Sequence, residues 1–267
     1  MILDRGDAAI RFDVRGAGPA IVFAHGLGGN HLSWWQQLPH FARRHTCVTF
    51  AHRGFPPSSA TPGAPIASAY ADDLLALLDR LKLDTAVLVC QSMGGWGGLE
   101  FALRHPERVT AMVMACTSGA VDFHKLEGLD RHWLQAWEEK SRRATVELPK
   151  RGASPAAGER MAREQPALHG LYAGLSGLTP PDFRDQVRRE ILALRHHSPE
   201  ILSGLRMPVL YLEGEEDLVF PPAAGQALAA LTPKGRHASV PESGHSVYFE
   251  RAERFNRLVD EFLDANR

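Results

Sequence analysis

The 267-residue sequence has few cysteines, no excess of either charge and no long apolar run. Its three cysteines, Cys47, Cys90 and Cys116, lie in apolar segments and cannot all pair with one another. We therefore expect buried thiols in a reducing compartment rather than a disulfide framework. No segment approaches the about 18 apolar residues that a membrane span needs, and the first residues lack an apolar core of secretory length. These absences predict a soluble, cytoplasmic protein.

The charges of the chain nearly cancel. Thirty Lys and Arg residues stand against 31 Asp and Glu residues, for a formal net charge of −1. A chain with so little net charge has no overall field that would attract nucleic acid or an acidic membrane surface. We therefore expect neither as a partner. The sequence leaves the oligomeric state open.

Apolar residues make up 44% of the chain, which is enough to bury a large core. Short apolar segments alternate with longer amphipathic ones, and this alternation predicts an α/β fold, a mostly parallel sheet with helices on both faces. Residues 2–15 alternate polar and apolar side chains and suit an antiparallel hairpin at the edge. The expected strands cover 20–24, 46–50, 86–89, 109–115, 209–212 and 237–240, and the expected helices cover 32–42, 69–81, 95–104, 223–231 and 247–263.

The alternation stops between Thr117 and Met207, an interval too long for an ordinary connection. We interpret residues 118–206 as a helical cap inserted after the sixth strand, with 1–117 and 207–267 forming the core. Breaks are expected at 149–158 and 179–181. Helical spacing relates Leu126, Leu129, Trp133 and Trp137, and again Phe183, Val187, Ile191 and Leu194.

Ser92 ends a short apolar run and precedes Met93, Gly94 and Gly95. A strand that turns into a helix through one residue holds that residue in a strained conformation, with its side chain beside the helix N-terminus. Cys90 stands where the G-x-S-x-G pattern has its first glycine, and its side chain is small. We predict that Ser92 is a nucleophile.

A serine nucleophile needs a general base and a carboxylate that orients the base. His245 follows Gly244 after one expected strand, and Asp217 follows another. Side chains at the carboxyl ends of parallel strands converge at one edge of the sheet. We predict that Asp217 and His245 complete the set. Glu213, Glu215 and Glu216 are alternatives to Asp217, because a shifted strand end would bring one of them into its place.

Two backbone N–H groups are expected to bind the negative oxygen that forms when a carbonyl is attacked. Met93, directly after the nucleophile, supplies one candidate. Leu27, in the glycine-rich segment 24–29, supplies the other. This segment lacks the P-loop lysine and the G-x-G-x-x-G spacing, so nucleotide binding is not expected. The adjacent His196 and His197 point in different directions on a helix, and no metal is expected there.

These motifs, in this order, resemble those of the α/β-hydrolase fold family, and in particular its capped serine hydrolases. The resemblance implies an eight-stranded, mostly parallel sheet flanked by helices, with an inserted helical cap. It also implies a triad of Ser92, His245 and Asp217, hydrolysis through an acyl-enzyme, and no cofactor. Esterases, enol-lactonases and hydrolases of carbon–carbon bonds share the pattern. The matching segments are 25–26, 53–55, 92–95, 105–109, 214–217 and 244–245.

One loop departs from the family pattern. Where relatives carry Asp-x-Arg-Gly-x-Gly, this chain has Ala51 for the aspartate and Pro56 for the second glycine. The loss of a carboxylate beside Arg53 has two interpretations. Either Arg53 is free to meet another group, or the change affects only local packing.

The leading hypothesis is a serine hydrolase that cleaves a carboxylic ester, lactone or thioester, with a small hydrophobic acyl compound as substrate. One alternative is hydrolysis of a carbon–carbon bond in a β-diketone, or a non-hydrolytic lyase reaction. A second is a ligand receptor with little turnover. The candidate substrate-binding residues either line an acyl pocket or simply hold the cap together; they are Trp133, Trp137, Leu171 and Tyr172.

Overall fold

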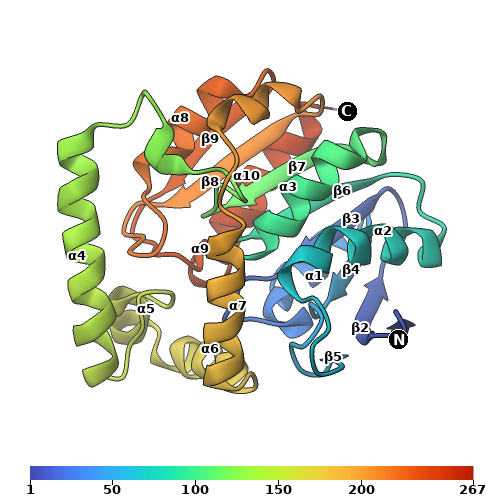
Figure 1. Ribbon diagram of the computed structural model, residues 1–267, viewed down its shortest axis with the longest axis horizontal. Helices are drawn as coiled ribbons and strands as arrows, with labels where there is room; N and C mark the ends of the chain where they lie inside the picture. Colours follow the sequence, from blue (N-terminus) through green and yellow to red (C-terminus); the bar gives the residue numbers. More distant parts are fainter. Residues whose placement is uncertain (267) are drawn as a thin grey trace.

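The apolar segments predicted as strands form the parallel part of one sheet in the computed structural model, which describes residues 1–266 (Figure 1). The strand order is β1-β2-β4-β3-β6-β7-β8-β9, and the two-residue β5 pairs with β2. Neighbours from β4 to β9 are parallel, whereas β2 pairs antiparallel with β1, β4 and β5. The strands are β1 Ile2–Asp4, β2 Ala8–Arg15, β3 Ala20–Ala24, β4 Thr46–Phe50, β5 Ser59–Ala60, β6 Ala86–Gln91, β7 Val109–Ala115, β8 Val209–Gly214 and β9 Gly235–Val240.

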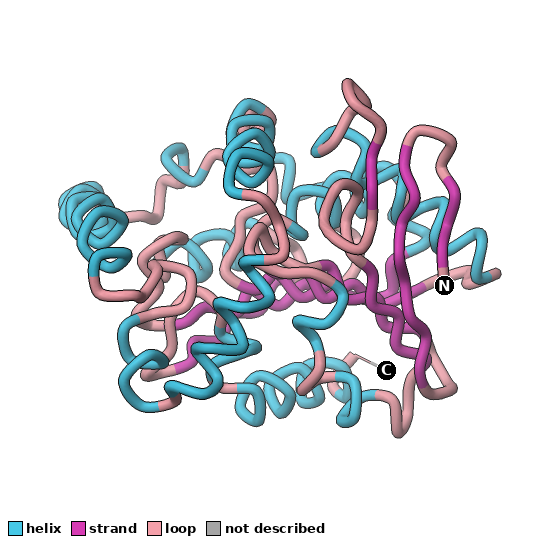
Figure 2. Tube along the Cα trace, turned by 90° about the horizontal axis from the view of Figure 1, so that it is seen from below, coloured by secondary structure: helices cyan, strands magenta, loops and turns pink. Residues whose placement is uncertain are grey.

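Helices lie on both sides of this sheet (Figure 2). Their cover explains why every residue of β3 and β6 is buried, as expected for parallel strands. The α-helices are α1 Leu38–Phe41, α2 Tyr70–Leu81, α3 Gly94–Arg104, α4 Arg131–Lys150, α5 Glu159–Glu164, α6 Pro166–Gly177, α7 Pro181–Ala193, α8 Ala223–Leu231, α9 Val247–Glu250 and α10 Ala252–Asp264. The 3-10 helices are η1 His31–Trp34, η2 Ala67–Ala69, η3 Pro106–Arg108, η4 Phe123–Lys125 and η5 Pro199–Gly204.

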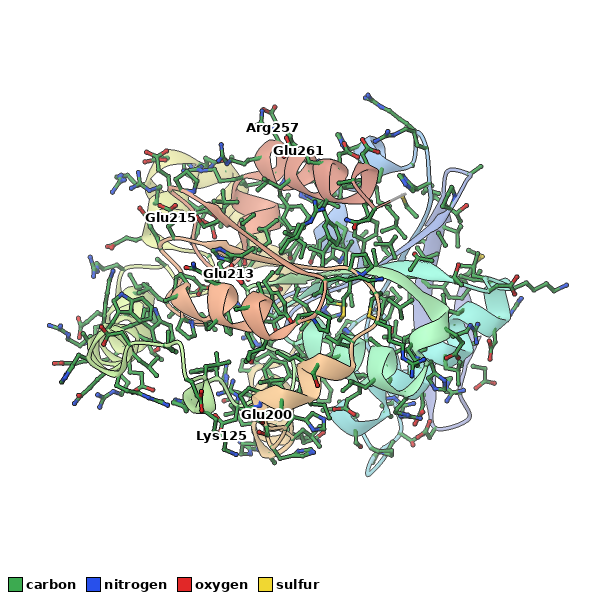
Figure 3. The ribbon with its side chains drawn as sticks, turned by 90° about the horizontal axis from the view of Figure 1, so that it is seen from above. Lys125, Glu200, Glu213, Glu215, Arg257 and Glu261 are labelled. Carbon is green, nitrogen blue, oxygen red and sulfur yellow. The ribbon has the colours of Figure 1, made fainter. Side chains whose placement is uncertain are left out.

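The predicted fold class is confirmed, although the sheet has nine strands within residues 1–266 where eight were expected, because the two-residue β5 also pairs with β2. The expected helix at 32–42 is divided into η1 and α1, and the one at 247–263 into α9 and α10. α10 is amphipathic: Phe255 and Val259 are buried against the core, while Arg257 and Glu261 project from the outer side (Figure 3). Within residues 1–266, no helix is both long and apolar enough to span a bilayer.

Residues 118–206 leave the sheet after β7 and return to it at β8, and they contain α4 to α7 (Figure 1). The expectation that Leu126 and Leu129 belong to a helix with Trp133 was wrong. The Asp130 carboxylate accepts the N–H groups of His132 and Trp133, so α4 begins at Arg131. Leu126 and Leu129 lie before Asp130, outside α4, and are buried in the core. The break expected at 149–158 is present from 151, because α4 continues two residues further, through Pro149 to Lys150.

The helix predicted from Phe183, Val187 and Ile191 is present as α7, and its apolar side packs against the main body of the protein. Val187 and Ile191 belong to a buried cluster with Tyr70 and Met93. Two hydrogen bonds fix the helix in place. The indole Nε1 of Trp96 donates to the Ile191 carbonyl at 2.8 Å, and the Ala67 N–H donates to Glu190 Oε2 at 3.1 Å. α7 is therefore attached to both η2 and the first turn of α3.

Arg53, in the loop that departs from the family pattern, is not free. Its side chain is 2% exposed, and it makes two hydrogen bonds of 2.6 Å to the carboxylate of Asp73 on α2. A third bond of 3.0 Å reaches Asp7. The bonds to Asp73 are the main reason why the pKa of Arg53 is raised. Aspartates from elsewhere in the chain thus replace the carboxylate lost at Ala51, which supports the packing interpretation.

We expect Asp73→Asn to lower the free energy of unfolding by about 3 kcal/mol, because it leaves the Arg53 charge buried without its principal partner. Urea denaturation measures this change. The matched control is Asp72→Asn, because Asp72 pairs with Arg104 at the surface and exposed pairs contribute only about 0–1 kcal/mol. Equal losses from the two variants would contradict the assignment of Arg53 as a buried anchor.

Candidate active site

Ser92 occupies the single turn between β6 and α3, as the sequence predicted. Its φ of 47° lies in the left-handed region, which non-glycine residues adopt only under strain. The turn is tightly packed, since a Cβ added at Gly94 would lie 2.4 Å from the Ala24 carbonyl oxygen on β3. Cys90 fits because α3 has a glycine opposite it: a Cβ at Gly98 would lie 2.5 Å from the Cys90 sulfur. The departure at Cys90 is therefore matched by Gly98.

Three predicted side chains form one hydrogen-bonded chain. His245 Nε2 lies 2.8 Å from Ser92 Oγ, and His245 Nδ1 lies 2.8 Å from Asp217 Oδ2. The other oxygen of Asp217 accepts the N–H groups of Val219 and Phe220 at 2.7 and 2.9 Å. Asp217 and His245 are 1% and 4% exposed. A carboxylate only accepts hydrogen bonds, so Nδ1 carries the ring hydrogen and Nε2 is left to accept from Ser92.

The carboxylates considered as alternatives to Asp217 have other partners. Glu213 is buried against α8, whereas Glu215 lies on the exposed loop beyond β8 (Figure 3). Glu213 lies 2.8 Å from His237 Nε2, Glu215 accepts from the Ser239 hydroxyl, and Glu216 binds Arg160. Burial raises the pKa of Glu213 to about 7. Asp217 is the one acidic residue of this stretch that is hydrogen-bonded to His245.

The loop after β3 lies directly against the Ser92 turn. A Cβ at Gly26 would lie 2.0 Å from Gln91 Oε1 and 3.1 Å from the Ser92 Cβ. Within residues 1–266, the N–H groups of Leu27 and Met93 donate no hydrogen bond to the protein. Both predicted donors are thus unused in this structure. Their role toward a substrate oxygen stays a prediction.

His25 holds this loop in shape. Its Nδ1 donates to the Gly26 carbonyl at 2.7 Å, and its Nε2 accepts the His52 N–H at 2.9 Å. Complete burial lowers the pKa of His25 to about 3, so the ring stays neutral and can make both bonds. The loop after β4 therefore supports the loop after β3.

The four predicted pocket residues fall into two pairs. Trp137 donates from its indole Nε1 to the Asp217 carbonyl at 2.9 Å, and Tyr172 is buried with its hydroxyl 2.9 Å from Ser246 Oγ. Both therefore contact residues within or next to the hydrogen-bonded chain. Trp133 and Leu171 are 38% and 45% exposed. Contact of any of the four with a substrate stays a prediction.

Two cavities lie near the ends of α7, and neither is lined by Ser92 or His245. One, of about 420 Å³, is lined by Phe183, Gln186 and much of the 54–66 loop. The other, of about 120 Å³, lies beside Trp96 and Leu194. Neither cavity is therefore assigned to the Ser92 site.

Comparison with known proteins agrees with this architecture. Residues 19–252 match the family model described as the alpha/beta hydrolase fold. The chain belongs to the α/β-hydrolase family. It is an enzyme of that family, and the predicted recognition and fold are confirmed.

Several relatives match this hydrolase over nearly its full length. BpoC of Mycobacterium tuberculosis, provisionally named a non-heme bromoperoxidase, is 27% identical, with coverage of 95% of this chain and 97% of BpoC. The 3-oxoadipate enol-lactonase 2 of Acinetobacter baylyi is 25% identical over 91% of this chain and 87% of its own. The solved structure of Est816, described as an N-acyl homoserine lactone degrading enzyme, has a TM-score of 0.80 and 27% identity, covering 98% and 100% of the two chains.

Cys116 also lies in the site of this hydrolase. Its thiol and the side chains of Asp217 and His245 bring potential metal ligands within 4.8 Å of one another, the one such group within residues 1–266. Burial, reinforced by the charge of Asp217, raises the pKa of the Cys116 thiol well above its usual value. Metals bind the thiolate, and both ring nitrogens of His245 already have partners. The donor set does not favour a metal.

Sequence reasoning missed two residues that hold His245. Gln91 Nε2 donates to the His245 carbonyl at 3.1 Å, and the buried Glu250 accepts the N–H groups of Gly244 and Ser246 at 2.8 and 3.1 Å. One signal was available in the sequence, because Glu250 is a carboxylate that directly follows the apolar residues Val247, Tyr248 and Phe249.

We expect Gly26→Ala to disturb the site, because the new methyl group would overlap the Gln91 side chain. Either the loop that carries Leu27 or the Gln91 side chain that binds the His245 carbonyl must then shift. A displacement of about 1 Å lowers catalytic rates by as much as about 100-fold. The rate at which a fluorophosphonate labels Ser92 measures the effect. Gly170→Ala is the control, because no described residue lies within 4 Å of the new methyl group. Equal labelling of the two variants would contradict the predicted role of this loop.

Proposed function

We propose that this hydrolase cleaves a carboxylic ester, lactone or thioester, with Ser92 as nucleophile, His245 as general base and Asp217 as the carboxylate that orients it. The observation that carries the proposal is the continuous hydrogen-bonded chain from Asp217 through His245 to Ser92, with both bonds at 2.8 Å. The strained conformation of Ser92 supports it, since such strain recurs where a nucleophile is presented to substrate.

In the first half of the reaction, Ser92 Oγ attacks the substrate carbonyl carbon while its proton passes to His245 Nε2. The carbonyl electron pair moves onto the oxygen, and the N–H groups of Leu27 and Met93 stabilise the resulting negative charge. When this intermediate collapses, the bond to the leaving oxygen or sulfur breaks. The leaving group takes its proton from His245, and the acyl group remains on Ser92.

In the second half, water attacks the acyl-Ser92 ester. His245 Nε2 takes a proton from the water, and the tetrahedral intermediate collapses with Ser92 Oγ as the leaving group. His245 returns the proton to Ser92, and the carboxylic acid is released. Asp217 keeps Nδ1–H oriented and stabilises the imidazolium that forms in each half. No metal or cofactor takes part in these steps.

The names of two relatives favour ester and lactone substrates. Est816 is described as degrading N-acyl homoserine lactones, and the Acinetobacter relative is named an enol-lactonase. A lactone is a cyclic ester, so both reactions need the same attack and the same oxyanion stabilisation. The buried Tyr172 and the half-buried Trp137 suit an apolar acyl or ring group, which is consistent with a small hydrophobic substrate.

We expect the wild-type protein to hydrolyse p-nitrophenyl esters of short to medium chain length or N-acyl homoserine lactones. We expect Ser92→Ala to lower kcat by at least about 1,000-fold without loss of fold, because the covalent route is removed. Steady-state rates and circular dichroism measure the two effects.

A folded wild-type protein that rejects all of these substrates would contradict the proposal. Turnover of a β-diketone under those conditions would identify a carbon–carbon bond hydrolase. Binding of a ligand without product release would identify a receptor.

Asp217→Asn tests whether Asp217 orients His245 or only fills a buried position. The amide retains the size of the side chain but presents an N–H group or a neutral oxygen to His245, and it favours the wrong ring tautomer. We expect kcat to fall by about 1,000- to 10,000-fold, measured with the preferred ester or lactone. Glu216→Gln, on the neighbouring exposed residue bound to Arg160, should change kcat less than about twofold. A similar loss in both variants would contradict the assignment of Asp217.

A further inference from the structure

Glu250 closes the loop that carries His245. The residue ends α9, and its carboxylate accepts the N–H of Gly244, which precedes His245, and the N–H of Ser246, which follows it. The side chain is buried, at 4% exposure. Within residues 1–266, these two amides are the only hydrogen-bond partners of the carboxylate, and no cation pairs with it. One side chain thus binds the chain on both sides of the predicted general base.

Resting on the proposed function, we propose that Glu250 is a positioning residue for His245, and that its ionised form keeps the imidazole aligned with Ser92. The proposal follows from the spacing of the two amide bonds. A carboxylate accepts on both oxygens at once, so it draws Gly244 and Ser246 toward one point and fixes the backbone of the residue between them. Gln91 holds His245 itself, because its side-chain amide donates to the His245 carbonyl.

The α4–α7 region shields this carboxylate from water. Gly158, with a φ of 71°, lies against it, and a Cβ at Gly158 would lie 3.4 Å from Glu250 Oε2. Tyr172 of α6 hydrogen-bonds Ser246, and Gln165 donates to the Glu250 carbonyl at 3.2 Å. The segment predicted as a cap therefore packs over both the buried carboxylate and the loop that Glu250 holds.

Because the carboxylate is shielded from water, its ionised form is disfavoured. Burial raises the pKa of Glu250 to about 7, partly offset by the two amide bonds. The charged groups that face it are Asp217, which raises this pKa further, and Arg251, which lowers it and hydrogen-bonds Glu164. The Tyr172 phenol also faces Glu250, and its own pKa is raised to about 12. Below about pH 7, the carboxyl takes up a proton and no longer offers two equivalent acceptors.

Protonation of Glu250 is expected to raise the stability of the folded protein and to lower its activity. The folded protein binds this proton more tightly than the unfolded chain, in which Glu has its ordinary pKa of 4.5. Lowering the pH from 8 to 5.5 passes through the folded pKa of about 7 and stays above 4.5, so it favours the folded state as far as Glu250 is concerned. The same change should weaken the alignment of His245. This stability effect follows from the raised pKa of Glu250 whatever its role, so the fall in activity is the readout that distinguishes a positioning role from a purely structural one.

The decisive variant is Glu250→Gln, compared with Glu250→Asp and with Glu253→Gln on the exposed start of α10. We expect Glu250→Gln to lower kcat by about 10- to 100-fold with little change in KM, because His245 is displaced while substrate binding is retained. On the acid side, the kcat of the wild type should fall with pH more steeply than the uptake of one proton can explain. The kcat of Glu250→Gln should fall with the slope of a single proton. Glu250→Asp should partly restore the steep limb, and Glu253→Gln should match the wild type.

Stability supplies a second measurement. Between pH 8 and 5.5, the wild-type Tm should rise relative to that of Glu250→Gln, while its kcat falls. Unchanged kcat and an unchanged acid limb in a folded Glu250→Gln protein would overturn the proposal. A lower Tm with a wild-type kcat profile would do the same, because it would assign Glu250 a structural role only.

A third readout does not depend on turnover. The Nδ1–H proton of His245 should give a low-field NMR resonance, assigned by its loss in His245→Gln. We expect this resonance to broaden or disappear in Glu250→Gln and to persist in Glu253→Gln. An inactive wild-type protein in which this difference is seen would refute the proposed function and leave the positioning role supported. An identical resonance in wild type and Glu250→Gln would refute the positioning role alone.

Discussion

The strained turn at Ser92 is the constraint on which the rest of the site depends. A φ of 47° places one residue between a buried strand and the first turn of a helix, and the neighbouring glycines let β3 and α3 approach it closely. Because this turn is held between packed elements, the position of Ser92 Oγ is set by the core. The cost of the strain is spread over that core, which is the usual condition for strain to persist in a native protein.

Around this fixed point, the other groups arrive on loops that follow parallel strands. Asp217 follows β8, His245 follows β9, and the Leu27 loop follows β3, so all of them reach the same edge of the sheet. Loops need their own support to hold such precision. His25 and His52 support the Leu27 loop, and Glu250 and Gln91 support the His245 loop. Buried polar residues therefore support the loops that carry Leu27 and His245.

The buried charged side chains of this enzyme have different kinds of partner. Arg53 is neutralised by aspartates from two other segments, and Glu213 meets His237. Among the described residues 1–266, the carboxylate of Glu250 has only amide partners, so its ionised form is held there by hydrogen bonds alone. The paired Arg53 is expected to act on stability, because it joins the loop after β4 to α2. Glu250 binds the amides on both sides of His245, the proposed general base, and there we propose that its charge acts on the geometry of the site.

The sequence by itself determined the fold class, the boundaries of β3, β4, β7 and α8, and the three residues of the hydrogen-bonded chain, because these depend on local apolar periodicity and short turn motifs. Tertiary structure decided the rest. The start of α4 depends on the Asp130 cap, the partners of Arg53 come from Asp73 and Asp7, and the role of Glu250 depends on how α9 folds back on the His245 loop. Such contacts join residues that no local pattern relates, since hydrogen bonding and burial are settled only when separate elements pack together.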